Sequence, residues 1–110
     1  MSNADAVRAF SQAYLSQDRV TAERLLAEDF VFTSPQDDHI GKAEFMTKCF
    51  PTADRLRAQE ILHVVPAGDD GVIILYEYEL RTGARYRNTE FSTVRDGKLA
   101  ETQVFFGGRF

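Results

Sequence analysis

Side chains that could transfer a proton cluster at residues 37–39. Asp37, Asp38 and His39 lie in a polar stretch that follows a Ser-Pro pair. Histidine changes charge near neutral pH and a carboxylate can orient its ring, so His39 is a candidate general base with Asp38 as its partner. The alternative is a solvated loop in which Asp residues form turns. Adjacent side chains rarely point the same way, which makes a direct Asp38–His39 contact awkward, and without a second His nearby no metal site is predicted.

Glu90 is another candidate proton carrier. It is the one carboxylate in the predicted strand 86–94. If its side chain faced the interior, burial would raise its pKa and make it an acid or base. The favoured register instead turns Thr89, Phe91 and Thr93 inward and Glu90 toward the back of the sheet. A one-residue bulge would reverse this assignment.

Three tyrosines could supply neutral hydrogen bonds. Tyr14 lies on the first predicted helix, where it is either a donor inside a pocket or a core aromatic with a tied hydroxyl. Tyr76 and Tyr78 share a strand face with Val72 and Ile74. They could pack under the helices, but the favoured interpretation is that they line a pocket and offer polar tips to a ligand.

Composition limits the classes of function. The 110 residues, 44% hydrophobic and 27% charged, suit one domain over residues 1–110. The net charge is −4 and the basic residues form no run, so neither nucleic acid nor a membrane surface is an expected partner. The single cysteine, Cys49, cannot form an internal disulfide. No signal peptide or membrane span is found, so a cytoplasmic location is expected by default. No phosphate loop or metal motif is present, and no cofactor is predicted.

Hydrophobic periodicity predicts helices before long strands. The predicted helices are 5–17, 19–27 and 42–50, with a strand at 30–33. The predicted long strands are 55–65, 72–80, 86–94 and 99–106. Short turns between these strands, such as Asp96-Gly97, force antiparallel neighbours, and helices must cover one face of such a sheet. The expected fold class is α+β, with three N-terminal helices packed on a strongly curved antiparallel sheet to form a cone with one apolar pocket.

This order of pieces resembles the nuclear transport factor 2 (NTF2)-like superfamily, within its SnoaL-like and ketosteroid isomerase-like branch. The pieces that carry the resemblance are Ala6–Phe10 leading to Tyr14, Phe30–Pro35, Gly41–Phe45, Tyr76–Tyr78, Glu90–Leu99 and Phe105–Gly107. The resemblance implies a pocket between the helices and the concave sheet face, and a homodimer through the sheet backs. Members include isomerases, cyclases, dehydratases, epoxide hydrolases and plain binding domains, so the fold alone does not choose a function.

The resemblance allows the residues needed for ketosteroid isomerase activity to be compared with those of this sequence. Tyr14 matches the oxyanion-hole tyrosine of ketosteroid isomerases, but Ser34 stands at the position of the base and Thr89 at that of the acid. That reaction needs a carboxylate base and a neutral carboxylic acid, and a serine without a base partner cannot replace a carboxylate. Ketosteroid isomerase activity is therefore not predicted.

The leading hypothesis is a small-molecule-binding domain whose ligand is modest, largely apolar and carries one or two oxygen functions. The expected ligand-binding residues are Tyr14, Phe32, Ser34, Phe45, Tyr76, Tyr78, Thr89, Phe91 and Val104. One alternative is a lyase, isomerase or hydrolase with His39, Asp38 or Glu90 as the proton carrier. Another is a dimeric accessory module with a filled pocket. An enzyme should show a titrating cavity group with a displaced pKa, whereas a binder should show only neutral donors.

Overall fold

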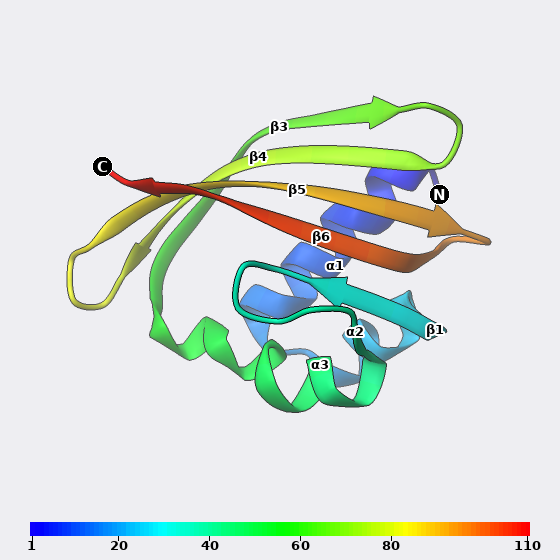
Figure 1. Cartoon of the computed structure of the whole chain (residues 1–110), viewed down its shortest axis with the longest axis horizontal. Helices are drawn as coiled ribbons and strands as arrows, with labels where there is room; N and C mark the ends of the chain where they lie inside the picture. Colours follow the sequence, from blue (N-terminus) through cyan, green and yellow to red (C-terminus); the bar gives the residue numbers. More distant parts are fainter.

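Helices dominate the first half of the chain and long strands the second half (Figure 1). The computed structural model describes residues 1–110. None of its helices has the length and hydrophobicity that a membrane crossing requires. The elements are α1 (Asn3–Ser16), α2 (Arg19–Leu25), β1 (Leu26–Thr33), β2 (Ile40–Gly41), α3 (Lys42–Lys48), the 3-10 helix η1 (Phe50–Arg55), β3 (Leu56–Ala67), β4 (Gly71–Leu80), β5 (Arg85–Arg95) and β6 (Lys98–Arg109).

The first two helices begin at side-chain caps. The Ser2 hydroxyl accepts a hydrogen bond from the backbone N–H of Asp5 at 3.1 Å, and the Asp5 carboxylate accepts one from the Ser2 N–H at 3.1 Å. This reciprocal capping box satisfies donors that the first turn leaves free. It starts α1 before the predicted boundary. Asp18 caps α2, since its side chain accepts a hydrogen bond from the N–H of Thr21 at 3.2 Å.

The chain after α3 differs from the prediction. The helix was expected to run to Phe50 and to be stopped by Pro51, but α3 ends at Lys48 and a 3-10 helix follows. Pro51 lies in the first turn of η1, where its missing N–H costs no helical hydrogen bond. This extra helix brings Thr52 and Arg55 to the wall of the cavity described below.

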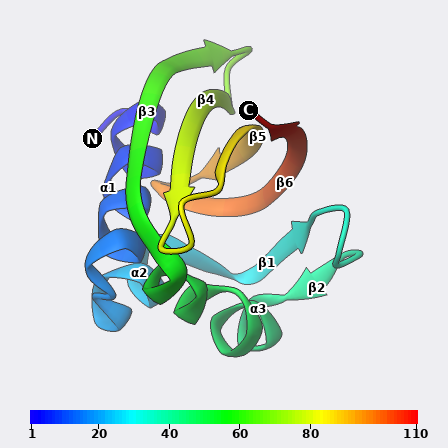
Figure 2. The ribbon, with the colours of Figure 1, turned by 90° about the vertical axis from the view of Figure 1, so that its left-hand side faces the viewer.

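The six strands form one mostly antiparallel sheet in the order β2-β1-β6-β5-β4-β3. β1 runs parallel to β6, and every other neighbouring pair is antiparallel. Figure 2 shows β3 to β6 bending in the same direction, with α1 running beside them and α3 below. The predicted α+β fold with helices on a strongly curved sheet is confirmed, while the short strand β2 was not predicted.

The core lies between the helices and the concave sheet face. Its centre is Phe45 of α3, which is 5% exposed. The Phe45 ring lies 5.3 Å from that of Phe30 and 4.8 Å from that of Phe32, measured between centroids. Val20 of α2 lies outside the core and is 69% exposed, because α2 has seven residues and buries only Ala22.

Candidate functional site

A cavity of about 620 Å³ lies between the helices and the concave face of the sheet. This volume is within the range of ligand pockets, roughly 300–1,000 Å³. Sixteen of its 29 lining residues are hydrophobic. Seven predicted ligand-binding residues line it, namely Tyr14, Phe32, Ser34, Phe45, Tyr76, Tyr78 and Val104. These seven side chains border the cavity, and their binding of a ligand stays a prediction.

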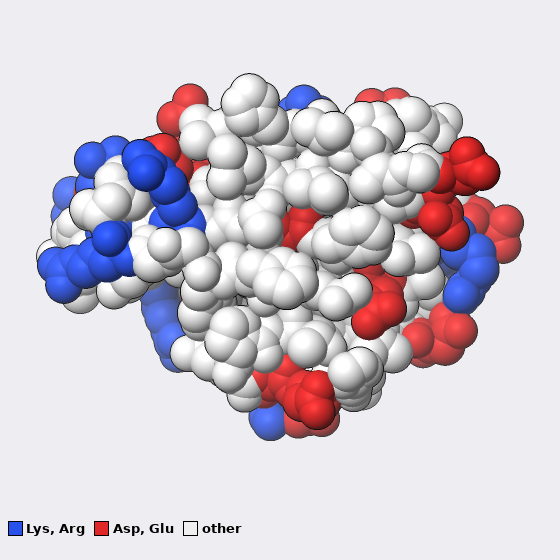
Figure 3. All heavy atoms as spheres, turned by 45° about the horizontal axis from the view of Figure 1, so that its top comes forward, with Lys and Arg blue, Asp and Glu red and all other residues white.

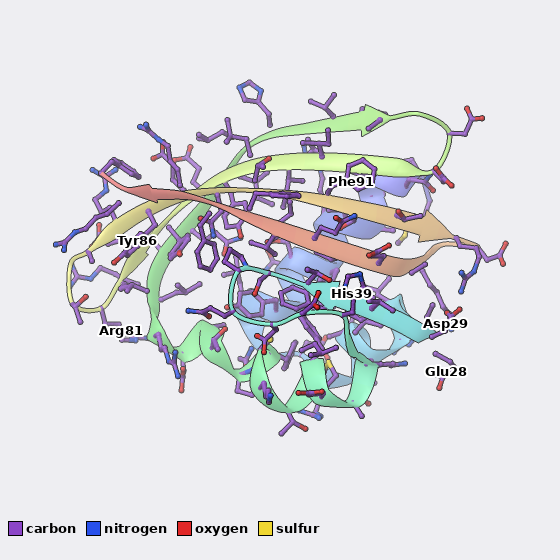
Figure 4. The ribbon with its side chains drawn as sticks, viewed as in Figure 1. Glu28, Asp29, His39, Arg81, Tyr86 and Phe91 are labelled. Atoms are coloured by element: carbon purple, nitrogen blue, oxygen red, sulfur yellow. The ribbon has the colours of Figure 1, made fainter.

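The predicted orientation of β5 is wrong. Asn88, Glu90 and Ser92 line the cavity, and the Glu90 carboxylate is hydrogen-bonded there to the inward Tyr76. Thr89 and Phe91 lie on the opposite sheet face with the exposed Ile73 and Phe105. Figure 4 shows Phe91 on the outer side of the sheet. Glu90 therefore faces inward, and Thr89 and Phe91 are not cavity residues.

A bulge in β6 explains the reversal. From the Asp96-Gly97 turn, Arg95 pairs with Lys98 and Val94 with Leu99, but Thr93 then pairs with Glu101. Ala100 is skipped, so the residues of β6 from Glu101 to Phe106 are displaced by one position. Without the bulge Thr89 would stand opposite Val104, whereas Glu90 does so here. Because directly opposed residues share a sheet face, the inward Val104 requires an inward Glu90.

Glu90 is the end of a chain of directed hydrogen bonds. The N–H of Gly107 donates to Asn88 Oδ1 at 3.4 Å, which leaves the Asn88 amide nitrogen to donate to the Tyr76 hydroxyl at 3.3 Å. The Tyr76 hydroxyl in turn donates to Glu90 Oε2 at 2.6 Å. Since a phenol has one proton, Asn88 directs that proton to the carboxylate. Glu90 Oε1 makes no hydrogen bond within the protein and is free for a ligand.

Burial raises the pKa of Glu90 above its ordinary value, and the hydrogen bond from Tyr76 opposes that rise only in part. Burial and the nearby Glu90 charge also raise the pKa of Tyr76, so its hydroxyl stays protonated. Burial raises the pKa of Cys49, a further cavity residue, to about 11, which keeps its thiol neutral and unreactive. Among these three groups, Glu90 is the carboxyl, and burial favours its protonated form relative to a solvated glutamate.

Tyr14 lines the cavity, but its hydroxyl already has a partner. The distance from Tyr14 Oη to Thr52 Oγ1 is 2.7 Å, and Thr52 Oγ1 donates to the carbonyl of Cys49 at 2.6 Å. Because Thr52 uses its proton on that carbonyl, Tyr14 must donate to Thr52. The Tyr14 hydroxyl can therefore accept from a ligand but has no proton to offer it. This is a tied hydroxyl, although the partner is a side chain and not the backbone.

Two further polar groups lie on the sheet face of the cavity. Ser92 and Thr102 are buried, and their hydroxyl oxygens are 2.9 Å apart. One proton makes the bond between them, so the other can donate to a ligand oxygen. Ser34, at the opposite wall, accepts from the N–H groups of Gln36 and Asp37 in a tight turn.

Asp38 and His39 lie outside the cavity. Neither lines it, and their side chains are 88% and 68% exposed. Their side chains do contact each other, with His39 Nδ1 2.5 Å from Asp38 Oδ1, although adjacent side chains are expected to point in different directions. His39 has φ of 53°, a left-handed conformation that differs from the extended backbone in which adjacent side chains diverge. Figure 4 shows His39 on the loop between β1 and β2.

Asn88, Ser92 and Thr102 were missed as site residues, and so was Thr52. A usable signal existed for the two β5 residues. Tyr76 and Val72 were correctly placed inward, and they pair directly with Asn88 and Ser92. Pairing β4 with β5 through their short turn would have turned Asn88, Glu90 and Ser92 inward. No comparable signal marks Thr52, because the 3-10 helix was not predicted.

The chain resembles known proteins in sequence and in structure. Residues 7–102 match the model of the SnoaL-like domain. No curated protein matches the chain significantly. A protein from Kribbella flavida superposes with a TM-score of 0.83 at 23% identity, covering 93% of this chain and 84% of that one. A putative polyketide cyclase from Sinorhizobium meliloti gives a TM-score of 0.80 at 19% identity, covering 92% and 94%.

An LEH-like epoxide hydrolase from M. tuberculosis also superposes, with a TM-score of 0.75 at 17% identity, covering 94% of this chain and 81% of that one. At these identities the structural matches establish the NTF2-like fold and not an activity. The family model spans most of the chain. The protein therefore belongs to the SnoaL-like family of the NTF2-like superfamily.

Proposed function

We propose that this protein binds a modest, largely apolar molecule with one or two oxygen functions in its cavity and catalyses proton transfer on it, with Glu90 as the proton carrier. The observation that carries the proposal is the inward Glu90 carboxylate, hydrogen-bonded to Tyr76 on a cavity wall that is otherwise mostly apolar. A cavity lined only by neutral donors would favour binding alone. A titrating group with a displaced pKa favours catalysis.

The site supplies both halves of a proton transfer. Ionised Glu90 removes a proton from the substrate through Oε1, while Tyr76 holds Oε2. The protonated carboxyl then returns the proton to a second substrate atom. Burial raises the pKa of Glu90, which favours the protonated form relative to a solvated carboxyl and helps Glu90 to hold the proton between the two steps. The free hydroxyl proton of the Ser92–Thr102 pair can hold a substrate oxygen.

The test is deuterium exchange at carbon. A panel of cyclic ketones and lactones is incubated in D2O with the wild type, and exchange next to the carbonyl is followed by NMR. Compounds are chosen first by thermal shift, since a ligand at a hundred times its Kd stabilises by about 2.7 kcal/mol. The variant Glu90→Gln keeps the shape of the side chain but cannot carry the proton. The matched controls Asp38→Asn and His39→Gln change the two candidates outside the cavity.

The wild type should accelerate exchange of at least one bound compound, and Glu90→Gln should lose about a hundredfold or more of that acceleration. Both control variants should keep it. Exchange that survives in Glu90→Gln, or that disappears in Asp38→Asn or His39→Gln, would overturn the role of Glu90. If compounds raise the melting temperature but the protein accelerates the exchange of none of them, the protein binds ligands without catalysing proton transfer.

We further propose a second copy of the chain as the partner of the outer sheet face. Ile73, Leu75 and Phe105 are 37%, 37% and 53% exposed on that face. Leu75 on β4 pairs with Thr89 on β5, which pairs with Phe105 on β6, so these residues form an uncharged strip across three strands, with Ile73 beside Leu75 on the same face. Such a strip can cover itself across a two-fold axis. Sedimentation should show a dimer that Leu75→Glu dissociates, while a monomeric wild type would contradict the proposal.

A further inference from the structure

Arginines gather around one end of the cavity. Five cavity-lining residues at this end are Arg55, Leu56, Leu80, Tyr86 and Gly108. Five further arginines are each next in sequence to one of these lining residues. The group, here called the arginine rim, consists of Arg55, Arg57, Arg81, Arg85, Arg87 and Arg109. Figure 3 shows basic side chains at this end of the molecule and mainly acidic ones at the opposite end, although the whole chain has a net charge of −4.

Carboxylates neutralise only part of the arginine rim. Glu77 contacts both Arg85 and Arg87, at 3.8 and 3.1 Å, and Glu79 contacts Arg57 at 2.9 Å. Arg81 donates to the backbone carbonyl of Asp54 at 2.7 Å, which leaves its charge uncompensated.

Arg55 lines the cavity, and its guanidinium makes no ion pair or hydrogen bond within the protein. A guanidinium presents paired N–H donors that match the two oxygens of a carboxylate. The other part of the wall carries Lys48 and Asp37, and Lys48 is paired with Glu44 at 2.6 Å. Arg55 is therefore the unpaired cation of the cavity wall.

Flat apolar surfaces lie at the same end. The rings of Tyr78 and Tyr86 stack with centroids 5.5 Å apart and an interplanar angle of 24°. Phe106 also lines the cavity and is 50% exposed. Figure 4 places Tyr86 and Arg81 at this end of the molecule, far from Glu28 and Asp29. Aromatic faces and an unpaired guanidinium on the wall of one cavity suit a molecule with an apolar body and an anionic end.

We infer that the molecule bound in the cavity is an apolar carboxylic acid, whose carboxylate pairs with Arg55 while its apolar body extends along the aromatic wall toward Glu90. This inference rests on the proposed function, because it names the substrate class of the same site. The remaining charge of the arginine rim attracts the anion before it enters. The carboxylate stays at the arginine end, so it does not compete with the group that reacts at Glu90.

The test uses two probes that differ in charge and hardly in shape, 2-naphthylacetate and 2-naphthylacetamide. Their affinities are measured by titration calorimetry at pH 7.5 in low salt and again in high salt. The wild type should bind the carboxylate about three- to tenfold more tightly than the amide, and salt should narrow the difference. Arg55→Gln should abolish the preference. The matched control Arg95→Gln should keep it, since Arg95 pairs with Asp29 at 2.5 Å, away from the cavity.

The outcomes separate the two proposals. If the amide binds as tightly as the carboxylate, or if Arg55→Gln retains the preference, the inference is wrong although the cavity binds ligands. If neither probe binds and no compound of the ketone and lactone panel shifts the melting temperature, the proposed function fails and the inference fails with it. A preference that Arg95→Gln also removes would show a non-specific charge effect and would overturn the role of Arg55.

Discussion

The hydrogen bond from Tyr76 to Glu90 leads to a quantitative prediction for Tyr76→Phe. At 2.6 Å the phenol donates to the ionised form of the carboxyl, and only that form gains fully from it. Hydrogen bonds to charged groups are worth about 1.5–3 kcal/mol, and one pKa unit corresponds to about 1.36 kcal/mol. Removing the hydroxyl while keeping the ring should therefore raise the pKa of Glu90 by about 1–2 units relative to the wild type.

The assay is a 13C NMR titration of protein labelled at the glutamate carboxyl carbons, with the Glu90 signal assigned by its absence in Glu90→Gln. Tyr86→Phe is the matched control, because Tyr86 lines the cavity but makes no hydrogen bond to Glu90. It should leave the pKa of Glu90 within a few tenths of a unit. An unchanged or lower pKa of Glu90 in Tyr76→Phe would show that the hydroxyl does not stabilise the carboxylate.

Three further predictions concern stability. Because the pKa of Glu90 is raised in the folded state, the free energy of unfolding of the wild type should fall as pH rises from the ordinary value of 4.5 through the folded pKa. The free energy of unfolding of Glu90→Gln, measured with urea, should therefore rise relative to that of the wild type between pH 4 and pH 8. A difference between the two proteins that does not change with pH would contradict a buried carboxyl. Phe45→Ala should cost about 3–5 kcal/mol, whereas Val20→Ala, at a residue that is 69% exposed on α2, should cost far less; equal losses in thermal unfolding would refute the assignment of the core. Ser2→Ala should lower the free energy of unfolding by about 1 kcal/mol, and an unchanged urea midpoint would show that the capping box contributes nothing.

Much of the fold could be predicted because its signals are local. Alternation of apolar residues placed the four long strands, and turn residues such as Asp96-Gly97 placed the hairpins between them. The cap at Asp18 needs only the residues that follow it. Contacts between distant segments determine the parallel pairing of β1 with β6 and the 3-10 helix after α3. No local sequence pattern therefore predicts them.

The candidate site was predicted on one wall and missed on the next for a single geometric reason. Tyr76 and Tyr78 were placed inward correctly because β4 alternates without interruption. The outward prediction for Glu90 assumes a register without a bulge, and the bulge at Ala100 shifts β6 by one residue. The signal against that register lies in β4, because Tyr76 pairs directly with Asn88. The predicted and observed registers differ by one residue. In the predicted register Thr89 and Phe91 face the cavity and the wall is neutral, whereas in the observed register Glu90 faces it and adds a carboxyl.

The central claim is that Glu90 titrates inside the cavity, and the wild-type carboxyl 13C titration tests it most directly. Performed without ligand, with Glu90→Gln to identify the signal, it should show Glu90 titrating above the ordinary value of 4.5. An added ligand of the cavity should displace that midpoint. A Glu90 midpoint at or below 4.5, insensitive to every compound that stabilises the protein, would place the carboxyl in solvent and contradict the proposed chemistry.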